Sequence, residues 1–156
     1  MGIEVLNGVR NWYGSRSAED KLPGLIKTEG YTKEMVVDFN YDDLPTNSED
    51  GSMVLTIPAD SLILSSRLHV KTAAAGGTSY TIGLAQADGT AIDADGLHTA
   101  AQAVTANLTE DAWLVGGGAL VGASVGAAAG QIVVAATGTF TAGSYRLIVE
   151  YVQPLS

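Results

Sequence analysis

Apolar and polar side chains alternate along several short segments of this chain. The strictest alternation is in residues 144–152 (SYRLIVEYV), and the same period of two recurs in residues 33–40, 52–57, 61–72 and 80–85. A period of two is typical of a β-strand with one buried face, so we predict a strand at each position. The residues expected on the buried faces include Met35, Val37, Phe39, Met53, Leu55, Ile57, Tyr80, Ile82, Leu84, Tyr145, Leu147, Val149 and Tyr151.

Other segments have a less regular pattern. In residues 61–72 the apolar positions are Leu62, Leu64, Leu68 and Val70, and the alternation is interrupted at Ser65 and Ser66, which predicts a bulge or bend there. The Asp-Gly pair in residues 86–90 predicts a tight turn. Further predictions are buried strands at 113–121 and 131–139, a short extended piece at 91–97 and a short helix in the Ala-rich residues 98–107.

Together these segments make roughly eight short strands separated by turns rich in Gly, Asp and Pro. Because no long helical period appears, we predict a mainly β fold, a single-domain β-sandwich or jelly roll. We place that domain at residues 33–156. Residues 1–32 have recurrent glycines and no sustained period, so we expect an irregular, extended N-terminal arm with one helical turn near residues 17–21.

The predicted arm carries aromatic and basic side chains, namely Arg10, Trp12, Tyr13 and Arg16. One interpretation is that the arm folds back and Trp12 covers the domain's own core. The other is that these residues dock on a partner protein, because aromatic residues and Arg are enriched at interface centres.

Residues 112–145 contain no charged side chain. An apolar stretch of this length is compatible with a transmembrane helix, but Gly, Ala, Ser and Thr dominate it and no Lys or Arg cluster flanks it. We therefore predict two interior strands joined by a glycine-rich loop, and no membrane partner. Small residues at Gly118, Gly122 and Gly126 would suit the close-packed seam of a trimer.

Formal charge is −9, and it is unevenly distributed. Residues 1–33 hold five basic and four acidic side chains, whereas residues 34–156 hold three basic and thirteen acidic. An acidic body repels phosphate backbones, so a nucleic-acid role is not expected. Solubility or a basic protein partner is the simpler explanation of the charge. The chain has no Cys, which excludes disulfides, and its first residues show no secretory signal pattern.

No residue pattern predicts catalysis. Ser124 lies in a G-x-S-x-G sequence, but both histidines, His69 and His98, precede it, unlike the order of an α/β-hydrolase triad. His69 is expected to face solvent in its strand and His98 to begin the short helix. We expect no enzyme and no cofactor.

Three carboxylates lie close together in the sequence DGTAIDADG, at Asp88, Asp93 and Asp95. They are the candidates for a Ca²⁺ site, although their spacing does not fit the EF-hand loop. Asp-Gly turns favour Asp for backbone reasons alone, so turn chemistry is the preferred interpretation and we expect no metal.

Residues 57–70, 76–97 and 136–153 resemble head decoration, or cement, proteins of tailed bacteriophages. They read as a strand after a Pro, then a strand, turn and acidic loop, then a closing hairpin. The resemblance implies a β-sandwich or jelly-roll body that binds the major capsid protein, as a homotrimer, and stiffens the shell. It also implies a location on the capsid surface after synthesis in the host cytoplasm.

Two hypotheses follow. The first is a virion structural protein that binds and stabilises the capsid shell. The alternative is a carbohydrate- or host-surface-binding β-sandwich module, such as a short head fibre. An exposed Trp or Tyr platform would favour the alternative, and both tryptophans, Trp12 and Trp113, have plausible arm or core roles instead.

Overall fold

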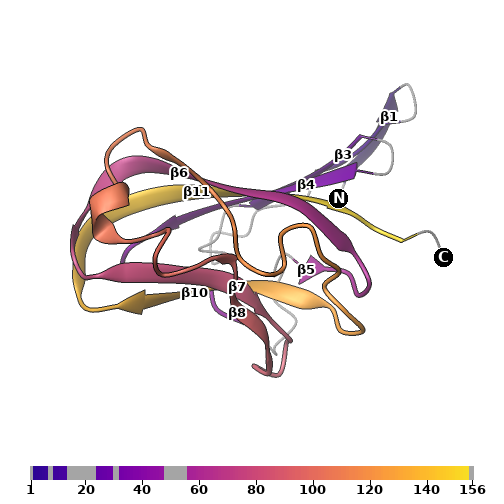
Figure 1. Ribbon diagram of the computed structural model, residues 1–156. Coiled ribbons are helices and arrows are strands. Elements are labelled where there is room, and N and C mark those ends of the chain that lie inside the picture. The colour runs from indigo at the N-terminus through magenta and orange to yellow at the C-terminus, as the bar shows by residue number, and fades with distance from the viewer. Residues whose placement is uncertain (1, 7–8, 14–23, 30–31, 48–55, 155–156) are drawn as a thin grey trace.

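The computed structural model describes residues 2–6, 9–13, 24–29, 32–47 and 56–154, shown in colour in Figure 1. The elements in chain order are β1 (Gly2–Leu6), β2 (Val9–Tyr13), β3 (Gly24–Glu29), β4 (Thr32–Asn40), β5 (Thr56–Ile57), β6 (Leu62–Gly76), β7 (Ser79–Ala85), β8 (Ala91–His98), the 3-10 helix η1 (Thr105–Asn107), β9 (Trp113–Val115), β10 (Gly130–Thr137) and β11 (Phe140–Val152).

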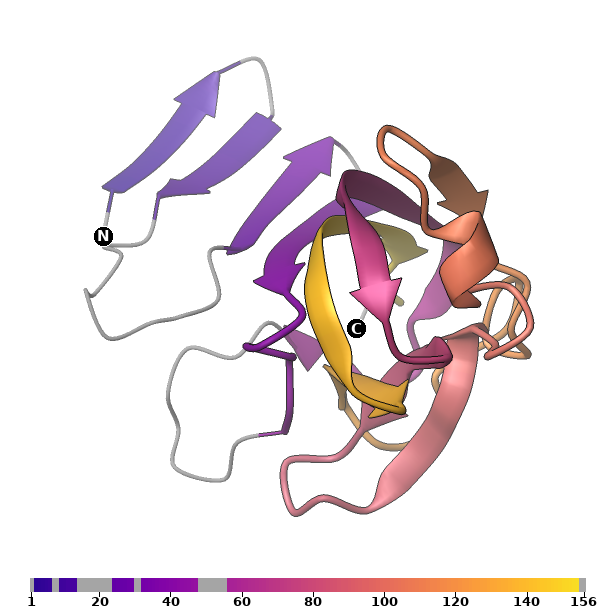
Figure 2. The same cartoon turned by 90° about the vertical axis from the view of Figure 1, so that its left-hand side faces the viewer.

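These strands form two antiparallel sheets that pack face to face, which confirms the predicted mainly β sandwich (Figure 1). The large sheet has seven strands in the order β1-β2-β3-β4-β11-β6-β9. The small sheet has four, in the order β5-β10-β7-β8. In Figure 2, the indigo strands β1 and β2 stand apart from the small sheet, so the sandwich proper involves the other end of the large sheet.

The strands from β4 to β11 pair in a nested order. β4 pairs with β11, β5 with β10, β6 with β9 and β7 with β8. This is the connectivity of one long hairpin folded over into two four-stranded layers, which is a jelly roll. The predicted jelly roll is therefore confirmed, and β1 to β3 continue its large sheet beyond β4.

The core lies between the two sheets and follows the alternation of the sequence. In β11, Tyr145, Leu147, Val149 and Tyr151 are all buried, and the residues between them are not. The register sets Leu147 opposite Val37 of β4, and both lie in the core. Burying each large apolar side chain contributes roughly 1.5–3 kcal/mol. The predicted core residues of 33–40 and 80–85 are likewise buried.

An aromatic cluster closes one end of this core. The rings of Tyr80 and Phe140 stack with their centroids 4.1 Å apart, and Tyr80 meets the edge of Tyr145 at 5.3 Å. Phe39 lies 5.2 Å from Tyr145. The cluster joins β4 and β11 of the large sheet to β7 of the small one. Burial raises the pKa of the Tyr80 and Tyr145 hydroxyls above their ordinary value.

The bulge predicted near Ser65 is present. The pairing of β6 with β11 shifts register between Ile63, opposite Tyr151, and Ser65, opposite Glu150. One residue, Leu64, is therefore extra on β6. The shift keeps Ile63 buried on one side of the bulge and Leu68 on the other, while Leu64 is exposed.

The structure corrects three predictions. Residues 2–6, 9–13 and 24–29 are not irregular, because β1 pairs with β2, and β3 pairs with β4 from Gly24 opposite Val37 to Glu29 opposite Thr32. Residues 98–107 form no α-helix; only η1 is helical, and the segment packs along β7 through the Tyr80 N–H donating to the Ala103 carbonyl at 3.0 Å. Residues 113–121 form no buried strand, since β9 ends at Val115 and Val115 is exposed.

Some predictions fall wholly or partly outside the described residues. The helical turn predicted near residues 17–21 lies completely outside the described residues. Of the strand predicted at 52–57, only Thr56–Ile57 is described. The division into an arm at 1–32 and a domain at 33–156 stays a prediction.

Candidate functional site

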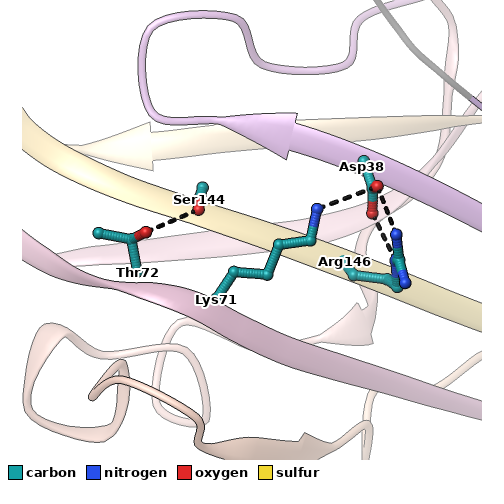
Figure 3. Close-up of polar contacts among 5 residues, drawn as sticks. All are labelled: Asp38, Lys71, Thr72, Ser144 and Arg146. Carbon is teal, nitrogen blue, oxygen red and sulfur yellow. Dashed lines mark hydrogen bonds and ion pairs between the residues drawn. The ribbon is translucent and has the colours of Figure 1, made fainter.

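The outer face of the large sheet, turned away from the small sheet, carries a row of ion pairs. Cross-strand register places Arg146 of β11 directly opposite Asp38 of β4. The Arg146 Nε and Nη2 donate to the two carboxylate oxygens of Asp38 at 2.7 and 2.8 Å, and Lys71 Nζ of β6 lies 3.0 Å from Oδ2 (Figure 3). Next to them the Ser144 hydroxyl donates to Thr72 Oγ1 at 3.0 Å.

These contacts lower the pKa of the Asp38 carboxyl. The hydrogen bonds from Arg146 are the largest cause, partial burial opposes them, and Lys71 adds to the lowering. The same pairing raises the pKa of Arg146. Asp38 is therefore an anion that pairs with two cations.

A second ion pair lies further along the face. Arg67 Nη2 of β6 lies 3.0 Å from Glu150 Oε1 of β11, and the Ser65 hydroxyl donates to Glu150 Oε2 at 2.7 Å. Arg67, Lys71 and Arg146 are the three basic residues of 34–156. All three are paired on this one face, so the acidic side chains elsewhere in the body set the sign of its field.

Exposed apolar side chains lie at two places on the large sheet. Among the described residues the exposed large hydrophobics are Leu62 (41% exposed), Leu64 (43%), Trp113 (57%) and Val115 (71%). The first two lie on β6 and the other two on its neighbour β9. Between Trp113 and Val115, Leu114 turns inward and packs against the core. The pair Trp113 and Val115, at an open sheet edge, is typical of an interaction surface.

Trp113 was predicted in a buried strand, and its exposure is the main finding that sequence reasoning missed. β9 is an edge strand with only three residues, so one face of Trp113 is open. Its other face stacks on His69, with ring centroids 4.4 Å apart and planes 19° from parallel. His69 Nε2 is 3.9 Å from Asp111 Oδ1. The acidic pair Glu110-Asp111, separated from the tryptophan by Ala112 alone, was the available signal for a surface position.

His98 was predicted to begin the short helix, and this prediction is wrong. It is the last residue of β8 and lies in the interior. Its Nε2 lies 3.0 Å from Ser66 Oγ of β6, and both side chains are fully buried. Burial lowers the pKa of His98 to about 4, so the imidazole is neutral near pH 7. Ser and His at this distance can form a nucleophile–base pair, but here the core seals both from any substrate. The pair is a polar contact between the two sheets.

Two of the three candidate calcium ligands, Asp88 and Asp93, support the β7–β8 turn and strand β8, and Asp95 takes part through its backbone N–H. Asp88 Oδ1 accepts from the Thr90 N–H at 2.9 Å, and this hydrogen bond lowers the Asp88 pKa. Asp93 Oδ1 accepts from the Asp95 N–H at 3.3 Å. In the described part of the chain no three His, Cys, Asp or Glu side chains gather as a metal site would require. Both carboxylates thus support the local backbone, as the turn interpretation expects.

The three candidate seam glycines occupy different environments. A Cβ on Gly118 would lie 2.3 Å from the Gly96 carbonyl carbon, so this glycine is required by packing within the chain. Gly122 and Gly126 have φ of +82° and +91°, and a Cβ on either would meet nothing within 4 Å. Their repeat therefore reflects turns at the surface. A trimer seam there stays a prediction.

Ser124 lies between those turns, where its hydroxyl accepts from the Gly126 N–H at 3.1 Å, an ordinary turn contact. None of the helices in the described residues has the length and apolar character needed to span a membrane.

Of the arm residues, Arg10, Trp12 and Tyr13 lie in β2, opposite Val5, Ile3 and Gly2 of β1. Arg16 lies outside the described residues. Their capsid contacts stay a prediction, as does the alternative that Trp12 covers the core.

Comparison with known proteins adds one weak likeness. No family model and no curated protein matches the chain. Among solved structures, a chain of the "Cyanophage Pam1 capsid asymmetric unit" is similar at 22% identity and a TM-score of 0.42, over 90% of this chain and 98% of that one. A likeness at this level carries no argument about function.

Proposed function

We propose that the chain is a virion structural protein that binds and stabilises the capsid shell of a tailed phage, as a decoration or cement protein. The observation that carries the proposal is the edge strand β9, where two of the exposed large hydrophobics among the described residues, Trp113 and Val115, lie on the same outward face. The sequence resemblance to decoration proteins supports the choice of the major capsid protein as partner. The site of action would be the capsid surface, without catalysis.

The adhesive free energy would come from apolar burial. Each Å² of apolar surface removed from water contributes roughly 25 cal/mol, although the loss of translational and rotational freedom offsets part of this gain. A small patch therefore binds weakly alone. A trimer would bring three patches to the shell at once and raise the apparent affinity through effective concentration. Arg10, Trp12, Tyr13 and Arg16 would add contacts from the N-terminal strands.

Two measurements test this proposal. Co-sedimentation with shells of the parent phage, assembled without this protein, should deplete it from solution until the sites are full. Light scattering should give a mass of about 48 kDa, because a trimer is three times the 16.0 kDa chain. A protein that stays in the supernatant at every shell concentration would exclude the cement function, and a 16 kDa particle would exclude a trimer formed before binding.

A second candidate function has one specific observation in its favour. Trp113 is 57% exposed, and an exposed Trp is the platform on which sugar rings stack in carbohydrate-binding modules. A glycan array with and without Ca²⁺ tests this candidate. Binding that disappears in Trp113→Ala would support a glycan-binding module, and a blank array under both conditions would remove it.

A further inference from the structure

The backbone of β9 presents hydrogen-bonding groups at an open sheet edge. Val70 donates its N–H to the Ala112 carbonyl at 2.9 Å, and Gly116 donates to the Ser66 carbonyl at 2.7 Å. In an antiparallel ladder, residues whose N–H and C=O groups point toward the partner strand alternate with residues whose groups point away from it. The N–H and C=O groups of Trp113 and Val115 therefore point away from β6, toward the free edge.

Gln102 occupies one part of this edge and fixes its position. Its Nε2 donates to the Val115 carbonyl at 3.3 Å, while its Oε1 accepts from the Gly117 N–H at 3.2 Å and the Thr99 N–H at 3.0 Å. Within the described residues, the Trp113 carbonyl and the N–H groups of Trp113 and Val115 have no comparable partner at the edge. β9 is thus a rigid strand end with free groups around Trp113.

The side chains around this edge combine apolar and acidic character. Trp113 and Val115 share the outward face, 57% and 71% exposed. Glu110 and Asp111 precede them, both exposed, and the Asp111 side chain is 88% exposed. Exposed edge strands are normally protected by Lys, Pro or inward charges, and Trp-Leu-Val has none of these.

We propose that β9 is the docking site for an extended, basic segment of the capsid protein. This inference rests on the proposed function and specifies which surface binds the shell. Apolar side chains of that segment lie on Trp113 and Val115, and its Lys or Arg side chains face Glu110 and Asp111. Its backbone bonds to the free groups of Trp113. Strand addition with alternate side-chain contacts is an established mode of peptide recognition.

The charges favour a basic partner over a second copy of this chain. A second copy brings the same formal charge of −9, and on the outer face of the sheet its body cations are already paired. Two like-charged bodies repel, whereas a basic segment gains Coulomb energy and a faster encounter. Leu62 and Leu64 lack this combination, because the free edge belongs to β9 and the acidic pair lies just before β9 in the chain.

The test compares matched surface variants for binding to shells assembled without the protein. Trp113→Ala and Val115→Lys alter β9, and Leu62→Ala and Leu64→Lys alter β6 at similarly exposed positions. Glu110→Gln with Asp111→Asn removes the acidic pair, and Asn tolerates the positive φ of 60° at position 111. Thermal unfolding confirms that each variant folds.

We expect Trp113→Ala and Val115→Lys to weaken shell binding at least ~30-fold, the loss typical of an interface hot spot. The acidic-pair variant should bind several-fold more weakly and lose most of its salt dependence, and the two β6 variants should bind within about 3-fold of the wild type. Hydrogen exchange at the Trp113 and Val115 amides should slow on the shell.

Three outcomes would count against the inference. If the wild type binds shells and the β9 variants bind as well as the β6 variants, the docking site is overturned while the cement function stands. If the β9 variants instead lower the solution mass of the free protein, the occupant is a second copy. If the wild type does not bind shells, the cement function and the docking site fail together.

Discussion

His98 Nε2 and Ser66 Oγ lie 3.0 Å apart with both side chains fully buried, and this contact joins β8 of the small sheet to β6 of the large sheet. A histidine in such a place is held neutral, because charging it would place a cation in the core. The contact therefore makes the stability of the sandwich sensitive to acid.

We predict a loss of stability between pH 6.5 and pH 4 that depends on His98. The folded pKa of about 4 lies below the ordinary value of 6.5, so the unfolded chain binds the proton first as pH falls. The contribution is fully present above pH 6.5. At pH 4.5 it has fallen by about 2.5 kcal/mol. Urea unfolding at pH 7 and pH 4.5 measures this loss of unfolding free energy.

The control for that prediction is His98→Gln, which keeps a polar side chain at this position but does not titrate. Asp38 and the other carboxylates titrate in both proteins and cancel in the comparison. Equal losses of unfolding free energy in the wild type and the variant would show that His98 is not the sensor.

We predict that Gly143→Ala is much more destabilising than Gly122→Ala. Both glycines have positive φ, +139° and +82°, so both substitutions carry backbone strain. Only at Gly143 would the new Cβ also meet a side chain, the Tyr145 hydroxyl at 2.1 Å, which cannot retreat from the core. We expect about 1 kcal/mol for Gly122→Ala and 2–4 kcal/mol more for Gly143→Ala, measured by urea unfolding.

The same Gly122 variant examines the predicted trimer seam. If Gly122 lies on the surface of the assembly, its alanine variant keeps the wild-type mass in light scattering. A change of mass, with the fold intact, would place this turn in a subunit contact.

We predict a small effect for Asp38→Asn. The substitution leaves Arg146 and Lys71 without their carboxylate, but all three side chains are partly exposed and water screens them. The expected loss is at most ~1 kcal/mol at low salt and less at high salt. Because the Asp38 pKa is lowered, this contribution is present above about pH 4 and is lost as pH falls further. A double-mutant cycle with Arg146→Ala isolates it, and a salt-independent loss would contradict the ion-pair explanation.

We predict that Trp113 is open to solvent in the free protein. In Trp12→Phe, Trp113 is the remaining tryptophan, and its fluorescence should be quenched readily by acrylamide. Trp12→Phe with Trp113→Phe provides the background signal. Emission that acrylamide barely reaches would mean that another part of the chain covers β9.

The strands with a clean period of two were predictable because their burial is one-sided. β4 and β11 have alternating buried faces, and their register then follows from matching those faces. The bulge was also visible, since Ser66 interrupts the apolar series of β6 and is itself buried against His98.

The missed features are those decided by tertiary neighbours. The Ala-rich residues 98–107 have helical propensity, but hydrogen bonds to β7 hold them along the sheet instead. Trp113 is exposed because β9 lies at a sheet edge, and an edge position depends on strand order rather than on local sequence. β3 has no clear alternation, yet it pairs along its length with β4.

The nested jelly roll also sets the order in which a newly made chain can fold. The β7–β8 hairpin closes locally, whereas Asp38 and Arg146 are 108 residues apart and meet only when the outermost strands pair. Such distant closure is slow and follows the local steps. Among the described residues β11 is synthesised after the other strands, and β6, which carries β9, pairs with it in the large sheet. A chain cut short before residue 140 cannot complete the large sheet, so the topology itself admits to assembly only copies that contain β11.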